Sequence, residues 1–420
     1  MLNFKINTDE IDKIGNFTKE EKNFRLKNLD YFNDIGLPNK KNEDWKFSDL
    51  KSIVSKNFSK LDIQLSKSKK QKVDFIKDFE HNYIVIVNGE LIISDFKYEE
   101  KSNIILKSFT NDNYINKKEN NPLVNLNHAL SDKGFFLEVK ENYKFKKILV
   151  IYYLFTKDLD ENILNSKNKI KIGKNSELHL LEYFVNDSKK NFFNNVHENI
   201  VLEKFAILKN IYLQSSKSSG YFHKYSKNKL FTGSNYTSFI FPAGLKFNKL
   251  DLEFNLEGER SECNLQSASF LDNNEHQEIK TRINHLSPNC KSYQKVKNVL
   301  NDESKGVYQG KIFVKDEAQK TDGYQLSKAI LLSESSEFDS KPELEIYADD
   351  VKCSHGSTSG SLDKDSIYYL MTRGLNQQES KQMLVNAFLN EIADTIKSNS
   401  IRNFIKTKLE TQLLNEYKKH

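Results

Sequence analysis

A Cys-x-His pair near the end of the chain is the clearest candidate for chemistry. Cys353 and His355 stand in the stretch ADDVKCSHGSTSGSLD, which reads as an extended segment that runs into a Gly/Ser/Thr loop. Residues i and i+2 of an extended backbone point to the same face, so a thiol and an imidazole would lie side by side. Both groups bind zinc, and both occur as ligands of iron–sulfur clusters. Two ligands do not complete a site, and a half-buried cysteine beside a hydrogen-bonded histidine explains the same spacing.

The segments that lead to this pair read as strands. From Ser176 to Val351, short strand-like runs alternate with polar turns and show no helical periodicity, a pattern typical of a sandwich, a barrel or a β-solenoid. Their spacing is too irregular to display a repeat. Some polar residues inside the runs would stack as ladders in a solenoid, although surface positions explain them as well: Gln309, Gln319, Thr321 and Gln325.

Both ends of the chain have helical patterns, so we expect a helical region at 1–80, a strand-rich core at 81–360 and a second helical region at 361–420. Thr18 and Glu21 form a capping box at the start of an N-terminal helix. Near the other end, Leu384, Phe388 and Ile392 recur at intervals of four residues. This stripe either packs on the core or forms a surface for a partner, and the pattern leaves both interpretations open.

The composition limits the classes of protein. The net charge of +6 comes from 64 basic and 58 acidic residues, so the chain has no concentrated basic field and we expect no nucleic-acid binding. Three cysteines make no disulfide framework and suit a reducing compartment. We see no signal peptide, and the longest apolar run, ILVIYYLF, is too short to span a bilayer. These features predict a soluble, cytoplasmic protein that does not bind membranes.

The chain lacks the common catalytic motifs. It contains no GxxxxGK[ST], CxxC, HExxH or GxSxG sequence, so we expect no enzyme activity of its own. Cys263 and Cys290 are isolated, and a lone histidine on a strand, such as His276 or His285, more often has a structural role.

The sequence around the Cys-x-His pair resembles that of a known family. ADDVKCSHGSTSGSLD followed by YYLMTRG, the strand GVYQGKIFV, and GLP at Gly36–Pro38 with EDWKF at Glu43–Phe47 are similar to motifs of the SufB/SufD family, and within it to its SufD branch. The resemblance is continuous from about residue 250 to about residue 390. Ser357, Ser359 and Ser361 depart from the residues common in that family, which puts details of the loop in doubt but not the resemblance.

The resemblance implies a fold and a role. The fold would be mainly β, a right-handed parallel β-helix with helical ends. The chain would be a non-catalytic scaffold subunit of the SUF iron–sulfur cluster assembly complex, paired with a SufB-like subunit, or with a second copy of itself when isolated. A SufC-type ABC ATPase would dock on the C-terminal helices, through Leu384, Phe388 and Ile392, and hydrolyse the ATP.

The same resemblance assigns a place to the candidate ligands. His355 would contribute to a transient iron–sulfur cluster, and to iron supply, at the interface with SufB. Cys353 would be either a second ligand or a packed thiol. No cofactor is expected on the isolated chain. A polysaccharide-binding or lyase-type β-helix protein is the alternative, since it shares the predicted fold class.

Overall fold

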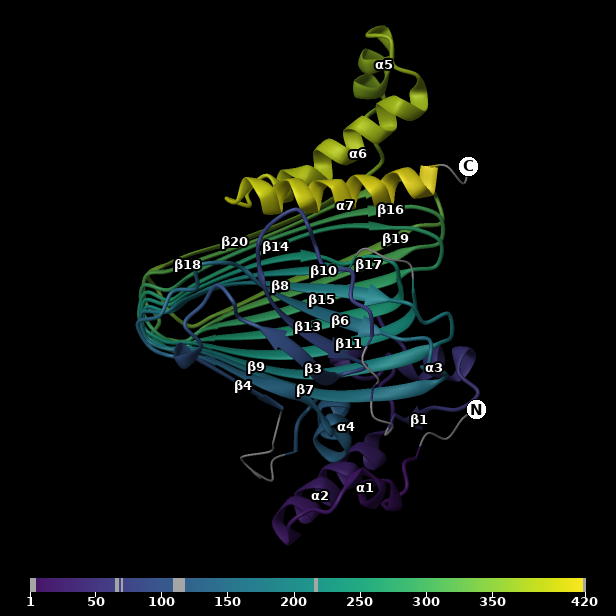
Figure 1. The fold of residues 1–420 in the computed structure, drawn as a ribbon. Helices are drawn as coiled ribbons and strands as arrows, with labels where there is room; N and C mark the ends of the chain where they lie inside the picture. The colour runs from purple at the N-terminus through teal and green to yellow at the C-terminus, as the bar shows by residue number, and fades with distance from the viewer. Residues whose placement is uncertain (1–4, 65–67, 69–70, 109–117, 215–217, 418–420) are drawn as a thin grey trace.

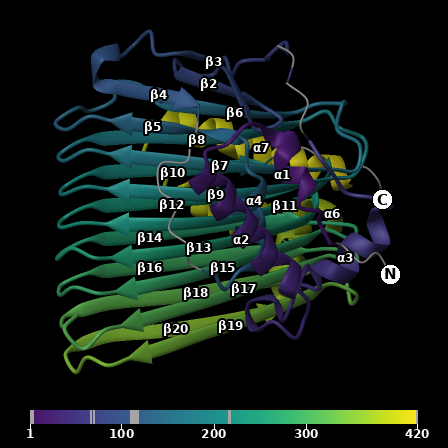
Figure 2. The ribbon, with the colours of Figure 1, turned by 90° about the horizontal axis from the view of Figure 1, so that it is seen from below.

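The computed structural model describes residues 5–64, 68, 71–108, 118–214 and 218–417. Most of these residues form a β-solenoid of about eight turns, with helices at both ends of the chain, which confirms the predicted β-helix. Each turn adds one strand to each of two ten-stranded sheets, and successive strands within a sheet are mostly parallel. Figure 2 shows the strands stacked in rows from one end of the solenoid to the other.

The first sheet has the order β19-β17-β15-β13-β11-β9-β7-β5-β4, and β1 pairs with β7. Its strands are β1 (Asp62–Ile63), β4 (Ile104–Ser108), β5 (Lys133–Val139), β7 (Asn162–Ile172), β9 (Phe192–Leu202), β11 (Ser218–Leu230), β13 (Leu245–Leu256), β15 (His276–His285), β17 (Lys305–Val314) and β19 (Glu337–Ile346).

The second sheet has the order β20-β18-β16-β14-β12-β10-β8-β6-β2-β3. Its strands are β2 (Asn82–Val87), β3 (Glu90–Asp95), β6 (Leu149–Phe155), β8 (Glu177–Asn186), β10 (Ile207–Gln214), β12 (Asn235–Phe241), β14 (Glu262–Leu271), β16 (Lys291–Leu300), β18 (Thr321–Leu331) and β20 (Val351–Gly360). Strands β2 and β3 are antiparallel and join at Asn88-Gly89, both with positive φ, as expected for a tight hairpin turn.

A stack of left-handed turn residues connects the coils. Each residue of this stack has a positive φ, and each donates its backbone N–H to a carbonyl of the next coil: Asn142, Asn175, Phe205, Gly233, Arg260, Asn289 and Lys320. Because the turn is defined by backbone conformation and not by one residue type, the structural repeat leaves little trace in the sequence.

The N-terminal helices cover the outer face of the first sheet (Figure 1). They are α1 (Asp9–Ile14), α2 (Lys19–Ile35), α3 (Leu50–Asn57) and α4 (Pro122–Leu130), with the 3-10 turn η1 (Glu43–Trp45). A second 3-10 turn, η2 (Lys101–Asn103), directly precedes β4. The Thr18 hydroxyl accepts a hydrogen bond from the Glu21 N–H at 3.2 Å, which confirms Thr18 as the N-cap of the predicted capping box. Trp45 is 1% exposed and packs against the Lys249 ammonium, so this segment anchors the helices to the sheet.

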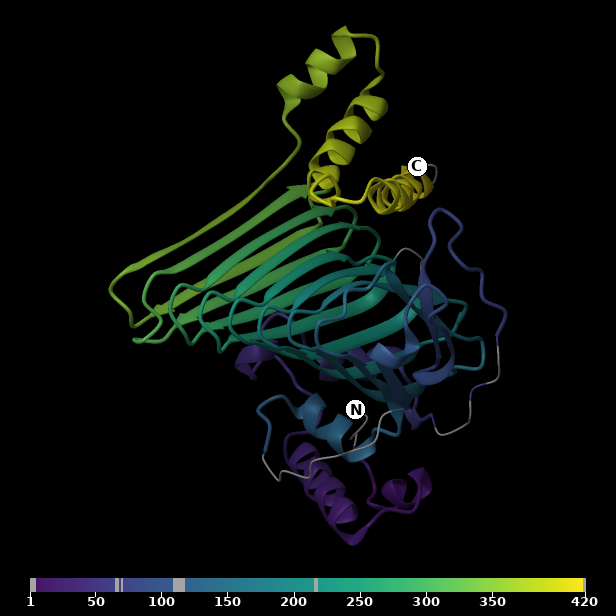
Figure 3. The same ribbon diagram turned by 60° about the vertical axis from the view of Figure 1, so that its left-hand side comes forward.

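The C-terminal helices lie on the opposite side, against the second sheet (Figure 1). They are α5 (Lys364–Thr372), α6 (Gln377–Ala393) and α7 (Asn399–Tyr417). Asn376 and Glu379 form a capping box that starts α6. Figure 3 shows α5 and the first part of α6 projecting away from the solenoid. None of the helices in the described residues is long and apolar enough to cross a membrane.

Candidate functional site

The last coil of the solenoid, made of β19 and β20, is its open end. The two strands are the edges of the two sheets and pair, within the described residues, only with β17 and β18. Their side chains are exposed or half-buried, whereas those of β17, the neighbour of β19, are mostly buried. An edge strand presents unpaired backbone N–H and C=O groups. The open end can therefore pair with a strand of another chain.

Cys353 lies on this last coil with its side chain turned inward. It pairs in register with Gly323 of β18, and its thiol packs at the edge of a small apolar cluster around Ile312 and Val314. Burial raises the pKa of the Cys353 thiol, and an N–H of Gly323 opposes this shift only in part. The free cysteine is thus a half-buried, neutral thiol, which loses its proton when it binds a metal.

His355 lies two residues further along the same face. It pairs in register with Gln325 of β18, but unlike Cys353 its side chain is exposed. The next residue on this face, Ser357, accepts a hydrogen bond from the Ser327 hydroxyl at 2.9 Å. The structure therefore brings the two predicted donor groups together at the open end of the solenoid, with the imidazole more accessible than the thiol.

This pair is too small to hold a metal ion or a cluster alone. Within the described residues, no group of three or more His, Cys, Asp or Glu side chains is arranged to bind a metal ion. Zinc takes four ligands, and an iron–sulfur cluster also takes several protein ligands. Any metal centre at this edge therefore needs donors from beyond the described part of this chain.

The other sulfur and imidazole groups lie deeper in the molecule. Cys263 is buried between the sheets, and Cys290 lies 3.3 Å from the Ser261 hydroxyl. His285 is completely buried beside the Ser292 hydroxyl. His276 contacts Ser48 at the junction with the N-terminal segment. These four residues make packing or hydrogen-bond contacts inside the molecule or at the junction with the N-terminal segment, and they lie apart from the exposed edge.

Of the predicted polar ladder, only Gln325 lies in a stack inside the solenoid. It pairs with Gln294 of β16, and both amides are completely buried. Gln309 instead donates to the Glu278 carboxylate on the outer side of the first sheet. Gln319 lies in a turn, where its side-chain amide oxygen accepts a hydrogen bond from the Asp350 N–H. Periodicity alone could not separate the interior position from the surface ones.

A buried ionic cluster inside the solenoid gives no sequence signal. The Lys224 ammonium lies 3.0 Å from Glu182 and 2.9 Å from Glu198, and all three side chains are buried between the sheets. Lysine and glutamate in strand-like runs read as solvated surface positions, so the pattern of the sequence hides this cluster.

The three residues of the predicted docking stripe differ in their burial on the C-terminal helices. Ile392 is completely buried against the second sheet and is not available to a partner. Phe388 is half-buried, with the Lys297 ammonium 4.2 Å from its ring centroid, and Leu384 is half-buried as well. The buried apolar residues of α6 include Val385, Leu389 and Ile392, so the face that packs on the solenoid coincides with the predicted stripe only at Ile392.

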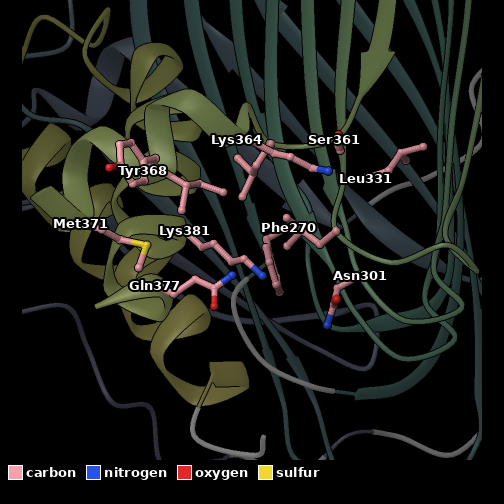
Figure 4. A pocket seen from close by; sticks show the side chains of 12 residues that line it. Phe270, Asn301, Leu331, Ser361, Lys364, Tyr368, Met371, Gln377 and Lys381 are labelled. Carbon is pink, nitrogen blue, oxygen red and sulfur yellow. The ribbon is translucent and has the colours of Figure 1, made fainter. Parts of the chain in front are cut away.

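The exposed apolar side chains of this region lie elsewhere. Helix α5 has no buried residue, and Tyr368 and Tyr369 are 71% and 57% exposed. Met371 on α5 and Met383 on α6 are exposed as well. A mainly apolar cavity of about 500 Å³ separates α5 from the solenoid (Figure 4). Its lining includes Phe270, Leu331, Leu332, Leu362, Ile367 and Met371.

The fold and this edge define a class of protein: a β-solenoid with an open last coil, a cysteine and a histidine side by side on that coil, and a projecting helical hairpin. The chain belongs to the SufBD family. Residues 155–388 match the family described as "SUF system FeS cluster assembly, SufBD core domain", and residues 8–151 match the SufBD N-terminal region. The family takes part in iron–sulfur cluster assembly, and the assignment replaces the carbohydrate-active alternative.

Relatives in other organisms agree with this assignment. The chain is 26% identical to the iron–sulfur cluster assembly protein SufD of Escherichia coli, over 90% of each chain. It is 25% identical to an iron–sulfur cluster assembly SufBD family protein of Synechocystis, over 96% of this chain and 95% of the relative. It is 23% identical to the chloroplastic protein ABCI7 of Arabidopsis thaliana, over 87% of this chain and 80% of the relative.

Proposed function

We propose that this chain is a non-catalytic, SufD-like scaffold subunit that builds an iron–sulfur cluster jointly with a SufB-like subunit. One observation carries the proposal. His355 and Cys353 lie side by side on the last coil, whose outer edge has no neighbouring strand among the described residues, and they supply fewer ligands than a cluster needs. A site shared with a second subunit accounts both for the exposure of His355 and for the missing donors. The cluster is cargo that is assembled and passed on, so the isolated subunit holds none.

The open end suits a second solenoid as its partner. Strand β20 carries small side chains, CSHGSTSG, that let another backbone approach closely, and its edge can extend a partner's sheet. Tyr347, 63% exposed at the end of β19, adds apolar surface beside this edge. In the absence of the SufB-like subunit, a second copy of the chain offers the same kind of edge and forms a homodimer.

The projecting helices suit the ATPase partner. The sequence has no phosphate-binding loop, so ATP hydrolysis falls to a SufC-type subunit. Exposed tyrosines and methionines are enriched in protein interfaces, and α5 and the exposed side of α6 present Tyr368, Tyr369, Met371 and Met383. We place the docking surface there, within 363–397.

The connection between the two surfaces supports a mechanical role. Strand β20 ends at Gly360 and α5 begins at Lys364, so the strand that carries His355 continues almost directly into the docking helix. When two ATPase subunits close on ATP, a displacement of α5 acts on β20 and shifts the population of states in which the shared site is accessible.

The assembly is tested by measuring the mass of the complexes. The chain alone, the chain with a SufB-like subunit, and the chain with both partners are compared by size-exclusion chromatography with light scattering. We expect a homodimer that is replaced by a heterodimer and then by a larger complex. A chain that stays unchanged when the SufB-like subunit is added would contradict pairing through the open end.

A further inference from the structure

We propose that the cavity between α5 and the solenoid binds a small molecule with an aliphatic chain and one anionic head group, a carboxylate or a phosphate. The inference goes beyond the proposed function and does not depend on it. The cavity has a volume of about 500 Å³, and small-molecule sites typically measure about 300–1,000 Å³. Such sites combine a mainly apolar lining with a few polar groups, as this cavity does (Figure 4).

Three parts of the chain form the walls of this cavity. Phe270 of β14 and Leu331 of β18 stand at the strand ends, and Phe270 is 2% exposed within the apolar cluster that packs under α6 and α7. Helix α5 forms the facing wall, and the start of α6 lies beside it. Residues 361–363 join α5 to β20, and residues 373–376 join it to α6. Both ends of α5 are therefore attached, and the backbone on either side keeps the cavity open.

The apolar lining of the cavity is only partly covered by the protein. Leu332, Leu362 and Ile367 are half-buried, and Met371 is 43% exposed. No residue of α5 is buried, although Ile367, Tyr368 and Met371 all line the cavity. Removing apolar surface from water is favourable, so an aliphatic chain that enters this space is stabilised by contact with both walls.

Two lysines on the helices determine the charge that the ligand must carry. Figure 4 shows Lys364 of α5 and Lys381 of α6 extending toward the strand ends, and both line the cavity. Among the described residues neither ammonium forms an ion pair, whereas Lys295 and Lys297 of the neighbouring β16 both pair with Glu391. The cavity therefore carries two positive charges that no carboxylate of its lining compensates.

The carboxylates at the starts of the two helices already have other partners. Asp363 accepts a hydrogen bond from the Ser366 N–H at 2.9 Å, and Glu379 accepts one from the Asn376 N–H at 2.8 Å. Both carboxylates thus cap helix ends, which leaves the lysine ammonium groups to a ligand. Lysine has a flexible stem and three donors, so both ammonium groups can follow one head group, and an anionic acceptor strengthens each hydrogen bond.

The methionine methyl groups of the full-length chain can locate the site. The chain has three methionines, of which Met371 lines the cavity and Met383 is exposed on α6 outside its lining. In ¹³C-methyl NMR we expect decanoate to shift the signal of Met371 and to leave that of Met383 unchanged, with Met371→Leu used for assignment. A titration that moves neither signal, or both equally, overturns the proposal.

Calorimetric titration with decanoate, decyl phosphate and decanol tests the head group. We expect both anions to bind more tightly than the alcohol, and the tighter of the two identifies the head group. Lys364→Ala and Lys381→Ala should each weaken the anions by up to about fivefold and leave decanol unchanged. Lys352→Ala, which removes an exposed lysine at the other end of β20, is the matched control and should bind as the unmodified chain does. Unchanged anion affinity in the double lysine variant overturns the proposal.

The length of the chain tests the apolar part of the site. Decanoate has two methylene groups more than octanoate, so it should bind more tightly by up to about 15-fold. Equal affinities would show that no aliphatic chain enters the cavity. If the cavity instead receives a segment of the ATPase, a SufC-type subunit will shift the Met371 signal and decanoate will not, which also overturns the ligand site.

Discussion

The Lys224 ammonium lies 2.9 Å from a carboxylate oxygen of Glu198 in the interior of the solenoid, where both side chains are almost completely buried. Glu182 lies 3.0 Å from the same ammonium. Burial opposes the charge of Lys224, but the two carboxylates outweigh it and raise the pKa of this lysine above its ordinary value. One buried cation thus compensates two buried carboxylates.

Replacing Lys224 by Met should therefore destabilise the fold strongly. Removing one partner of a buried ion pair costs about 3–5 kcal/mol, because it leaves an uncompensated charge in the interior. Urea unfolding followed by circular dichroism measures the change in the free energy of unfolding.

Lys209→Met is the matched control for this variant. Lys209 also pairs with a glutamate, at 3.1 Å from Glu177, but its side chain is 36% exposed. Exposed ion pairs contribute less than about 1 kcal/mol. Equal losses of stability in Lys224→Met and Lys209→Met would show that the interior cluster is unimportant.

A second prediction concerns acid stability. Burial lowers the pKa of His285 to about 4. In the unfolded chain the pKa of histidine is about 6.5, so between these values the unfolded state binds a proton that the folded state does not. Stability contributed by neutral His285 is present above about pH 6.5 and is lost as the pH falls toward 4, by about 1.4 kcal/mol per pH unit.

His285→Gln should reduce the number of protons taken up on unfolding by about one, and so flatten the dependence of the free energy of unfolding on pH. The measurement is the free energy of unfolding in urea at several values between pH 4.5 and 7. A slope that His285→Gln leaves unchanged would contradict the assignment of the buried neutral imidazole.

A third prediction separates the two partner surfaces. Tyr369→Asp places a charge on the exposed face of α5 and should abolish capture of the SufC-type ATPase while pairing with the SufB-like subunit persists. Tyr347→Asp, at the end of β19, should weaken pairing with the SufB-like subunit and leave ATPase capture intact. Pull-down of each partner by the tagged chain provides both measurements.

Both tyrosines are more than half exposed, so neither change should reduce thermal stability by more than a few degrees. Ile392→Asp, by contrast, should unfold part of the C-terminal region, because Ile392 is completely buried. If Tyr369→Asp still captures the ATPase at full yield, the docking surface lies elsewhere.

Much of the fold could be predicted from local chemistry. The Thr18 cap depends on neighbouring residues alone, and the structure confirms it. The Asn376 capping box and the Asn88-Gly89 hairpin follow from local chemistry of the same kind. The coil repeat could not be read, because its left-handed turns use residues as different as Phe205 and Lys320. A backbone conformation that many side chains tolerate leaves no fixed motif.

In the candidate site, too, some features follow from local sequence and others only from the whole fold. The spacing of Cys353 and His355 placed both side chains on one face, because strand geometry is local. Their unequal exposure depends on β20 being the last strand of its sheet, which only the whole fold determines. The helical stripe that contains Ile392 fits either the core or a partner, because periodicity does not show which apolar surface a helix meets; in the structure Ile392 packs against the second sheet.

The measurement that tests the central claim most directly is cluster assembly by the reconstituted complex with His355→Ala and, separately, Cys353→Ala. Iron and sulfide incorporation is followed by visible absorption, with light scattering to show that each complex has assembled. We predict that His355→Ala assembles normally but fails to build clusters, while Cys353→Ala retains much of the activity because its thiol is half-buried. A His355→Ala complex that builds clusters at the rate of the unmodified complex would contradict the shared site.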